Sequence, residues 1–184
     1  MTVGRWLRRN AWAFPVMVAV LALSSFSECE QRYDAYRRDG ALVASRPGAD
    51  GWAGYGGARV RLVRLREFRP VDYARVPVAL PPGTTAWEAE LEFDLPSAEA
   101  LSGCQIRLRS GSGWIYTTNP AELRRMSGRD FVNCAPDDPG KNPGRQIVAG
   151  RAHFVVPATE SPGAVEVIRA TLLPRYAELP SGAT

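Results

Sequence analysis

The chain has 184 residues and a formal net charge of +4, from 23 basic and 19 acidic residues. Three of the basic residues, Arg5, Arg8 and Arg9, lie at the N-terminus, so residues 28–184 carry 20 basic against 19 acidic groups. A remainder so close to neutral gives no basic face for nucleic acid, and we expect no nucleic-acid partner. Residues 28–184 are numerous enough to form one domain with its own hydrophobic core.

Residues 10–27 contain no charged side chain and lie between these arginines and Glu28. As a helix, the segment reaches about 27 Å, close to the ~30 Å hydrocarbon core of a bilayer. It is therefore predicted to be a single transmembrane helix that contacts membrane lipid. Because basic flanks stay in the cytoplasm, residues 1–9 form a cytoplasmic tip and the C-terminal domain is extracytoplasmic, at the plasma membrane.

Two other interpretations of this segment stay open. A cleaved signal peptide has the same basic start, with Phe14–Leu23 as its apolar region and a cleavage site after Ser24. A buried helix of a soluble protein fits less well, because the segment stands isolated between charges. Residues 28–38 lack proline and glycine and can continue the helix outward, so we expect the anchor to be retained.

Residues 28–57 are predicted to form a juxtamembrane helix followed by a glycine-rich linker. Four glycines follow Gly48 within nine residues, a composition that ends a helix. Trp52 and Tyr55 are large for a free linker, and we expect at least one of them to pack on the domain.

The exported part contains Cys104 and Cys134, which are predicted to form a disulfide because thiols outside the cytoplasm tend to pair. The bridge would close a loop of about thirty residues and so stabilise the fold by restricting the unfolded chain. Cys29 is left over near the membrane surface. We expect it to be free; acylation, or pairing with Cys29 of a second chain, are the alternatives.

The clearest strand is Thr85–Leu95, in which apolar residues alternate with four acidic residues over eleven positions. Ala58–Phe68 alternates in the same way, with arginines on its polar side, and its pattern slips at Leu62-Val63, which predicts a bulge. If the two strands are neighbours, pairs of opposite charge would set their register.

Further strands are predicted from the same kind of alternation and from turn residues between them. Gly111-Ser112-Gly113 is typical of a hairpin turn. The predicted strands are Gly103–Ser110, Trp114–Thr118, Gln146–Val156 and Ala164–Leu173. Residues 58–180 therefore predict a mainly β fold, an antiparallel β-sandwich, with an immunoglobulin-like topology as the first choice and a small open barrel as the second.

Residues 119–145 show no strand pattern and exceed the usual length of a loop. The segment is a candidate binding loop, with Asp130, Asp137 and Asp138 as its acidic groups and Trp114 at the preceding turn. The spacing of these aspartates matches no calcium loop. An insertion without a binding role is the equal alternative.

No catalytic, cofactor-binding or metal-binding motif is found in the sequence. His153 is the only histidine and lies inside a predicted strand, so we interpret it as structural rather than as part of a catalytic triad. A zinc site would need more histidines or free thiols. The predicted aromatic core consists of Trp87, Trp114, Tyr116 and Phe154; Trp114 alone is placed where a turn could expose it.

Several short motifs together resemble a group of uncharacterised bacterial membrane proteins of actinobacterial type. The motifs are the basic start Arg5–Arg9, Leu80–Gly83 before Trp87, Leu101–Leu108, Gly113–Tyr116, Phe154–Pro157 and the tail Leu173–Pro180. The resemblance implies one membrane helix and an exported immunoglobulin-like domain. It implies no activity.

These observations predict a membrane-anchored protein of the cell envelope that is not an enzyme. Its exported sandwich would bind another envelope protein or a cell-wall component, or act as a scaffold. One alternative is an envelope enzyme or a solute or calcium sensor that uses residues 119–145. A second alternative is an accessory subunit of a membrane complex that acts through its helix.

Overall fold

The computed structural model consists of two compact units, Met1–Gly40 and Ala41–Thr184. It describes residues 15–18, 20, 33, 40–97, 99–118, 120–126, 134 and 144–182. In the first unit, residues 15–18, 20 and 33 are helical, and the rest of the predicted membrane segment and juxtamembrane helix, with Cys29, lies outside the described residues. Among the described residues, no helix has the length and apolar character needed to cross a membrane.

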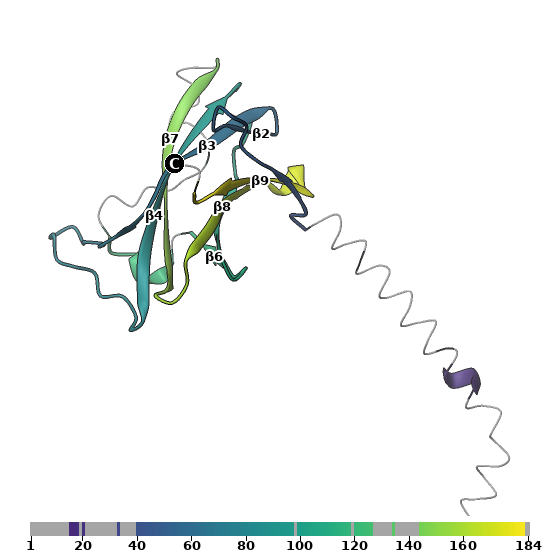
Figure 1. Ribbon diagram of the computed structural model, residues 1–184, viewed down its shortest axis with the longest axis horizontal. Helices are drawn as coiled ribbons and strands as arrows, with labels where there is room; N and C mark the ends of the chain where they lie inside the picture. The colour runs from purple at the N-terminus through teal and green to yellow at the C-terminus, as the bar shows by residue number, and fades with distance from the viewer. Residues whose placement is uncertain are drawn as a thin grey trace, which may run out of the picture. The chain divides into compact units, whose positions relative to one another are not determined.

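The second unit is a β-sandwich, as predicted (Figure 1). Its elements are β1 (Val43–Ser45), β2 (Ala53–Tyr55), β3 (Ala58–Phe68), β4 (Thr84–Leu95), β5 (Gln105–Ser110), β6 (Ile115–Thr117), η1 (Ala121–Leu123), β7 (Gln146–Pro157), β8 (Pro162–Ile168), η2 (Ala170–Leu172) and β9 (Arg175–Pro180). One sheet has the order β1-β9-β8-β5-β6 and the other the order β2-β3-β4-β7. All neighbours pair antiparallel except β1 and β9, which pair in parallel.

The pairing of β3 with β4 confirms the two strands that alternation predicted most clearly. The register shifts between Leu62 and Arg64, which confirms the bulge. Opposite charges face each other across the two strands, in the pairs Arg59 with Asp94, Arg61 with Glu92 and Arg66 with Glu88.

The folded unit begins at Ala41, ahead of the start at residue 58 that the glycine-rich composition predicted. Residues predicted as linker form the short strands β1 and β2. Gly56 and Gly57 join β2 to β3 with φ angles of 59° and 79°, so they form a tight hairpin turn that requires positive φ at both positions. Tyr55 is buried, and its hydroxyl accepts a hydrogen bond from the Arg169 N–H at 2.8 Å, which confirms that an aromatic residue of this segment packs on the domain.

The last predicted strand, Ala164–Leu173, is too long. Strand β8 ends at Ile168, the η2 turn follows, and the chain returns as β9. Strand β9 was not predicted as a separate strand because Ala177, Glu178 and Leu179 are all buried, so the alternation of polar and apolar residues is missing there.

The core lies between the two sheets. Strand β4 supplies Leu91, Phe93 and Leu95, and the opposite sheet supplies side chains such as Leu108 and Val165, all at most 1% exposed. Two of the four predicted aromatic core residues, Trp87 and Tyr116, pack against this core while partly buried, and Phe154 is fully buried.

Candidate functional site

The structure describes only part of the binding loop that the sequence predicted. Trp114 is 69% exposed at the turn between β5 and β6, so its assignment to the core was wrong. The backbone of the turn explains this exposure. The Trp114 N–H donates to the buried Ser110 hydroxyl at 3.1 Å, and the indole ring lies on the outside of the turn. Asp130, Asp137 and Asp138 lie outside the described residues.

The predicted disulfide is present between Cys104 and Cys134, whose Cα atoms are 5.8 Å apart, within the normal range for a cystine. Both cysteines are buried. The bond therefore ties the residue before β5 to the segment between β6 and β7.

The outer face of the four-stranded sheet carries a ladder of ion pairs. Three of the four arginines of β3 donate to the acid opposite them on β4: Arg59 Nε to Asp94 at 2.9 Å, Arg61 Nε to Glu92 at 2.7 Å and Arg66 Nε to Glu88 at 2.9 Å. The guanidinium groups of Arg59 and Arg61 also lie over the Trp52 ring, 5.1 and 4.7 Å from its centroid. The charges of this face largely neutralise one another.

Asp94 accepts from two arginines. Arg145, just before β7, donates from Nε to Asp94 Oδ1 at 2.7 Å, and Arg59 donates to Oδ2. The hydrogen bonds from Arg145 and Arg59 outweigh burial and hold the pKa of Asp94 well below its ordinary value. The C-terminal end of the predicted loop is therefore fixed to β4 by charge.

His153 lies on β7 directly opposite Glu88 and is only 2% exposed. Its Nε2 is 3.1 Å from Glu88 Oε2, and the Phe68 ring lies 5.2 Å from its own ring. Burial raises the pKa of Glu88, but hydrogen bonds from Arg66 and His153 outweigh it, so this pKa is lowered overall. A histidine so enclosed agrees with the structural role expected from the sequence.

The five-stranded sheet carries a different network, which the sequence did not predict. Glu166 on β8 and Glu178 on β9 lie directly opposite each other and are 3% and 7% exposed. Arg109 on β5 donates to both, at 2.9 Å and 2.8 Å. Arg107 donates a further bond to Glu166 at 2.8 Å, and the Tyr176 hydroxyl donates to Glu178 at 3.2 Å.

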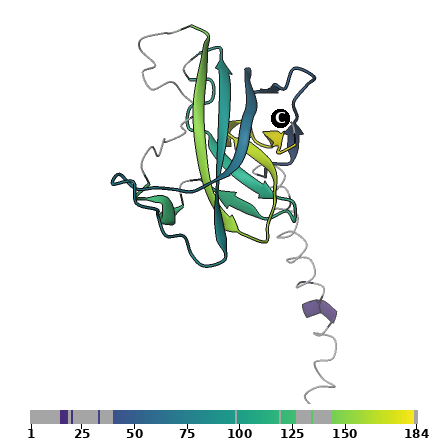
Figure 2. The ribbon, with the colours of Figure 1, turned by 60° about the vertical axis from the view of Figure 1, so that its left-hand side comes forward.

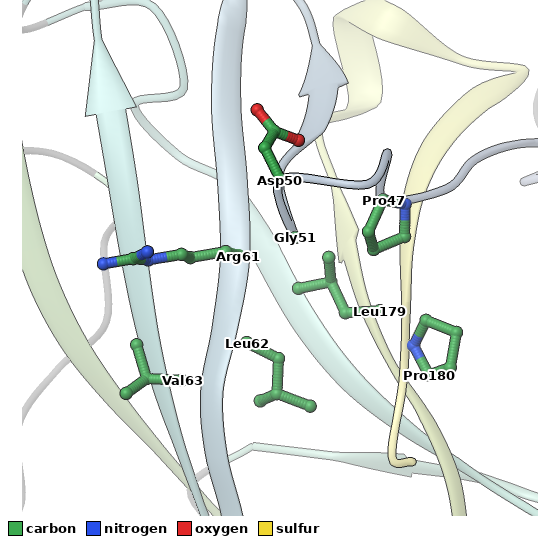
Figure 3. A pocket seen from close by; sticks show the side chains of 8 residues that line it. All are labelled: Pro47, Asp50, Gly51, Arg61, Leu62, Val63, Leu179 and Pro180. Atoms are coloured by element: carbon green, nitrogen blue, oxygen red, sulfur yellow. The ribbon is translucent and has the colours of Figure 1, made fainter. Parts of the chain in front are cut away.

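A cleft of about 290 Å³ lies between β3 of one sheet and β9 of the other (Figure 3). Leu62 and Leu179 point into the space between the two strands, while Arg61 points away from it. The lining consists of Pro47, Asp50, Gly51, Arg61, Leu62, Val63, Leu179 and Pro180. The lining of the cleft is therefore mostly apolar, and Asp50 and Arg61 are its charged residues.

Backbone groups without strand partners border this cleft. Strand β2 pairs with β3 only over residues 58–60, so among the described strands residues 61–68 pair only with β4. Strand β1 pairs with β9 over residues 175–177 and then reaches Pro47, which has no N–H with which to extend the ladder. Free strand edges with exposed N–H and C=O groups are the surfaces to which extended peptides add.

A second cleft, of about 370 Å³, lies between β6 and β7 on the side where the predicted loop begins. Ile115 is 41% exposed beside it, and Pro120 and Glu122 line it from the start of the loop. Among the described residues that line it, Glu122 alone is charged. Trp114 is not among the residues that line this cleft.

Within the part of the chain that the structure describes, no group of three histidine, cysteine or acidic side chains could hold a metal ion. The charged residues of both outer faces are mostly engaged with one another. Among the described residues, the β3–β9 cleft and its free strand edges are therefore the feature best suited to binding. The sequence did not predict it, because it depends on where the short strands β1 and β2 end.

Comparisons with known proteins add little to this picture. No family model matches the chain, and no curated protein matches it either. Among solved structures, the chain is similar to an uncharacterized β-sandwich protein from Clostridium difficile 630, with a TM-score of 0.42 and 7% sequence identity, covering 74% of this chain and 93% of that one. The fold is therefore assigned from the strand pairing itself.

Proposed function

We propose that the chain is a membrane-anchored binding module of the cell envelope, without enzymatic activity, whose sandwich binds an extended peptide segment of an envelope protein at the β3–β9 cleft. The observation that carries this proposal is the unpaired edge of β3 from Arg61 to Phe68, next to an apolar cleft. A peptide could add to this edge through its backbone and place an apolar side chain against Pro47 and Pro180, which line the cleft and keep exposed surface.

The location outside the cytoplasm has two supports. The uncharged segment 10–27 follows three arginines, which favours a cytoplasmic N-terminus and an exported domain. The Cys104–Cys134 bond favours an oxidising compartment, because cytosolic thiols are kept reduced. The resemblance to single-pass proteins of actinobacterial type is part of the same proposal.

We also infer an immunoglobulin-like sandwich. Support comes from the strand order: β3-β4-β7 faces β9-β8-β5-β6, as strands A-B-E face G-F-C-C′ in domains of that type. The disulfide differs, because immunoglobulin domains join strands B and F, whereas here Cys104 is bonded to a residue between β6 and β7. The inference concerns topology alone and carries no partner with it.

The binding proposal is tested by blocking the free edge with a charge. Val63 is 43% exposed at the bulge, so Val63→Lys should leave the fold intact while a lysine in the edge opposes strand addition. Ile147, 68% exposed on β7, provides the matched control as Ile147→Lys. The full chain is purified from gently solubilised membranes, and the copurifying material of the three proteins is compared.

We expect a partner that is retained by Ile147→Lys and lost from Val63→Lys. If all three proteins retain the same partner, or enrich only a wall polymer, the cleft is not the binding site. The location is tested separately by a reporter fused after Thr184. Activity of the reporter only inside the cell would refute the exported position of the domain.

A further inference from the structure

The segment between β3 and β4 contains a structured turn, residues 71–76, that exposes apolar side chains. The Asp72 carboxylate accepts the N–H groups of Ala74 and Val76 at 2.8 and 2.9 Å. Two backbone bonds close the turn, from the Asp72 N–H to the Val76 carbonyl and from the Arg75 N–H to the Asp72 carbonyl. Tyr73 is 80% exposed and Val76 is 55% exposed. Large apolar groups are therefore held outward by a hydrogen-bonded frame.

Arg75 occupies a backbone conformation that favours glycine. Its φ is 63°, in the left-handed region where an L side chain crowds its own carbonyl group. Glycine at this position would relieve the strain, yet the turn carries an exposed arginine. A strained residue that is fixed by its surroundings on a surface loop is a reason to look for a function there.

More arginines lie next to this turn. An isolated bridge pairs Asp72 with Met126, which brings the residues after η1 beside the turn, and Figures 1 and 2 both show η1 next to the projecting loop. Leu123 and Met126 are buried, whereas Arg124 and Arg125 between them are exposed. The exposed arginines of this region, none of which forms an ion pair with another described residue, are Arg69, Arg75, Arg124 and Arg125.

We propose that the 71–76 turn is a membrane-docking tip that binds the anionic headgroups of a phospholipid surface. Tyrosine is favoured at the level of the headgroups, and guanidinium groups bind phosphate through paired hydrogen bonds. A protein partner fits less well, because a stable interface buries about 800 Å² on each side, more than a narrow turn offers. A membrane needs only a few inserted side chains and a basic surround.

Docking of the 71–76 turn on lipid goes beyond the proposed function but rests on it, because the proposed anchor holds the domain close to a membrane. If residues 10–27 span the bilayer, residues 28–40 keep the domain within about 45 Å of its surface at full extension. Tethering raises the effective concentration of the tip at the surface, so a weak contact is sufficient.

The test uses the full chain in lipid nanodiscs with an environment-sensitive dye on a single cysteine. Cys29→Ser removes the thiol outside the disulfide, and Val76→Cys carries the dye; Ile147→Cys, more exposed and on β7, carries it in the control protein. Emission is compared between zwitterionic discs, discs with added phosphatidylglycerol, and the same anionic discs in high salt. Arg124→Gln with Arg125→Gln is the test variant, and Arg175→Gln, at an exposed site on β9, is its control.

We expect a blue shift at position 76 in anionic discs only, reversed by high salt and absent at position 147. Each arginine removed should weaken the docking equilibrium about fivefold. If the chain inserts but the emission at positions 76 and 147 shifts equally, the proposal that the turn docks on lipid is wrong. It is also wrong if the shift at position 76 appears only when membrane protein extract is added, because that result would indicate an acidic protein partner. Failure of the chain to insert would instead refute the anchoring.

Discussion

The two sheets of the sandwich both bury acidic side chains, but they compensate them differently. On the four-stranded sheet, each acid of β4 faces an arginine of β3, so every cross-strand pair is attractive. On the five-stranded sheet, Glu166 and Glu178 face each other, and only Arg109, one strand away, donates to both. The first arrangement specifies strand register, whereas in the second one guanidinium bridges two facing carboxylates that Arg107 and Tyr176 each contact singly.

This difference predicts unequal tolerance to the loss of one arginine. The ladder of the four-stranded sheet has several members, and Glu88 keeps His153 as a second partner if Arg66 is lost. If Arg109 is lost, Glu166 keeps Arg107 at 2.8 Å, and Glu178 keeps Tyr176 and a longer contact from Arg46 at 3.5 Å. No described cation would then contact both of the facing carboxylates, so their repulsion would be less compensated.

The largest effect is therefore expected for Arg109→Met. Arg109 is the described cation that contacts both facing carboxylates, so its loss removes two charged hydrogen bonds and leaves the repulsion less compensated, and the free energy of unfolding should fall by about 2 kcal/mol at neutral pH. Arg66→Met, the matched change on the other sheet, should cost less, because Glu88 keeps His153 and faces no second carboxylate across the strands. Urea unfolding followed by circular dichroism measures both.

Adding Glu178→Gln to Arg109→Met provides the internal control. It removes one of the two facing charges and should recover part of the lost stability. If Arg66→Met is as damaging as Arg109→Met, or if the second change recovers nothing, the contrast between the sheets is not electrostatic.

The sequence predicted one of these networks and not the other, and the reason is periodicity. Alternation in residues 58–68 and 85–95 revealed both strands, their polar faces and the complementary charges. Strand β9 has three consecutive buried residues, so neither its existence nor the opposition of Glu166 and Glu178 could be inferred. The β3–β9 cleft was missed for a related reason, because it depends on the ends of strands that are only three residues long.

A charge reversal sharpens the claim that the ladder sets register. Arg61→Glu places a second carboxylate opposite Glu92, and we expect a loss of about 1 kcal/mol in the free energy of unfolding. The double variant with Glu92→Arg restores an attractive pair and should recover most of that loss, apart from the contact of Arg61 with the Trp52 ring. A double-mutant cycle by urea unfolding isolates the pair; an additive cycle would contradict its role.

The pH dependence of the ladder follows from Asp94. Its pKa is held well below the ordinary value by Arg145 and Arg59, so its contribution to stability is present above the unfolded pKa of about 3.9 and is lost as the pH falls through the folded value. Asp94→Asn should therefore lower stability at pH 7, and the difference from the unchanged protein should shrink below about pH 4. Urea midpoints measured across that range test the sign, and a difference that grows in acid would contradict it.

The smallest effect is expected at the hairpin that lies in the five-stranded sheet but outside its acidic network. Trp114 is 69% exposed, so Trp114→Ser should change the free energy of unfolding by no more than about 0.5 kcal/mol, despite the loss of a large aromatic ring. Trp87, partly buried against the core, gives the matched comparison, and Trp87→Ser should cost several times more because it removes buried apolar surface. Equal losses would mean that the indole of Trp114 is covered in the native protein, by the loop that follows it or by a bound partner. A near-zero loss at Trp114 would show that the sensitivity of the five-stranded sheet resides in its buried acids rather than in the sheet as a whole.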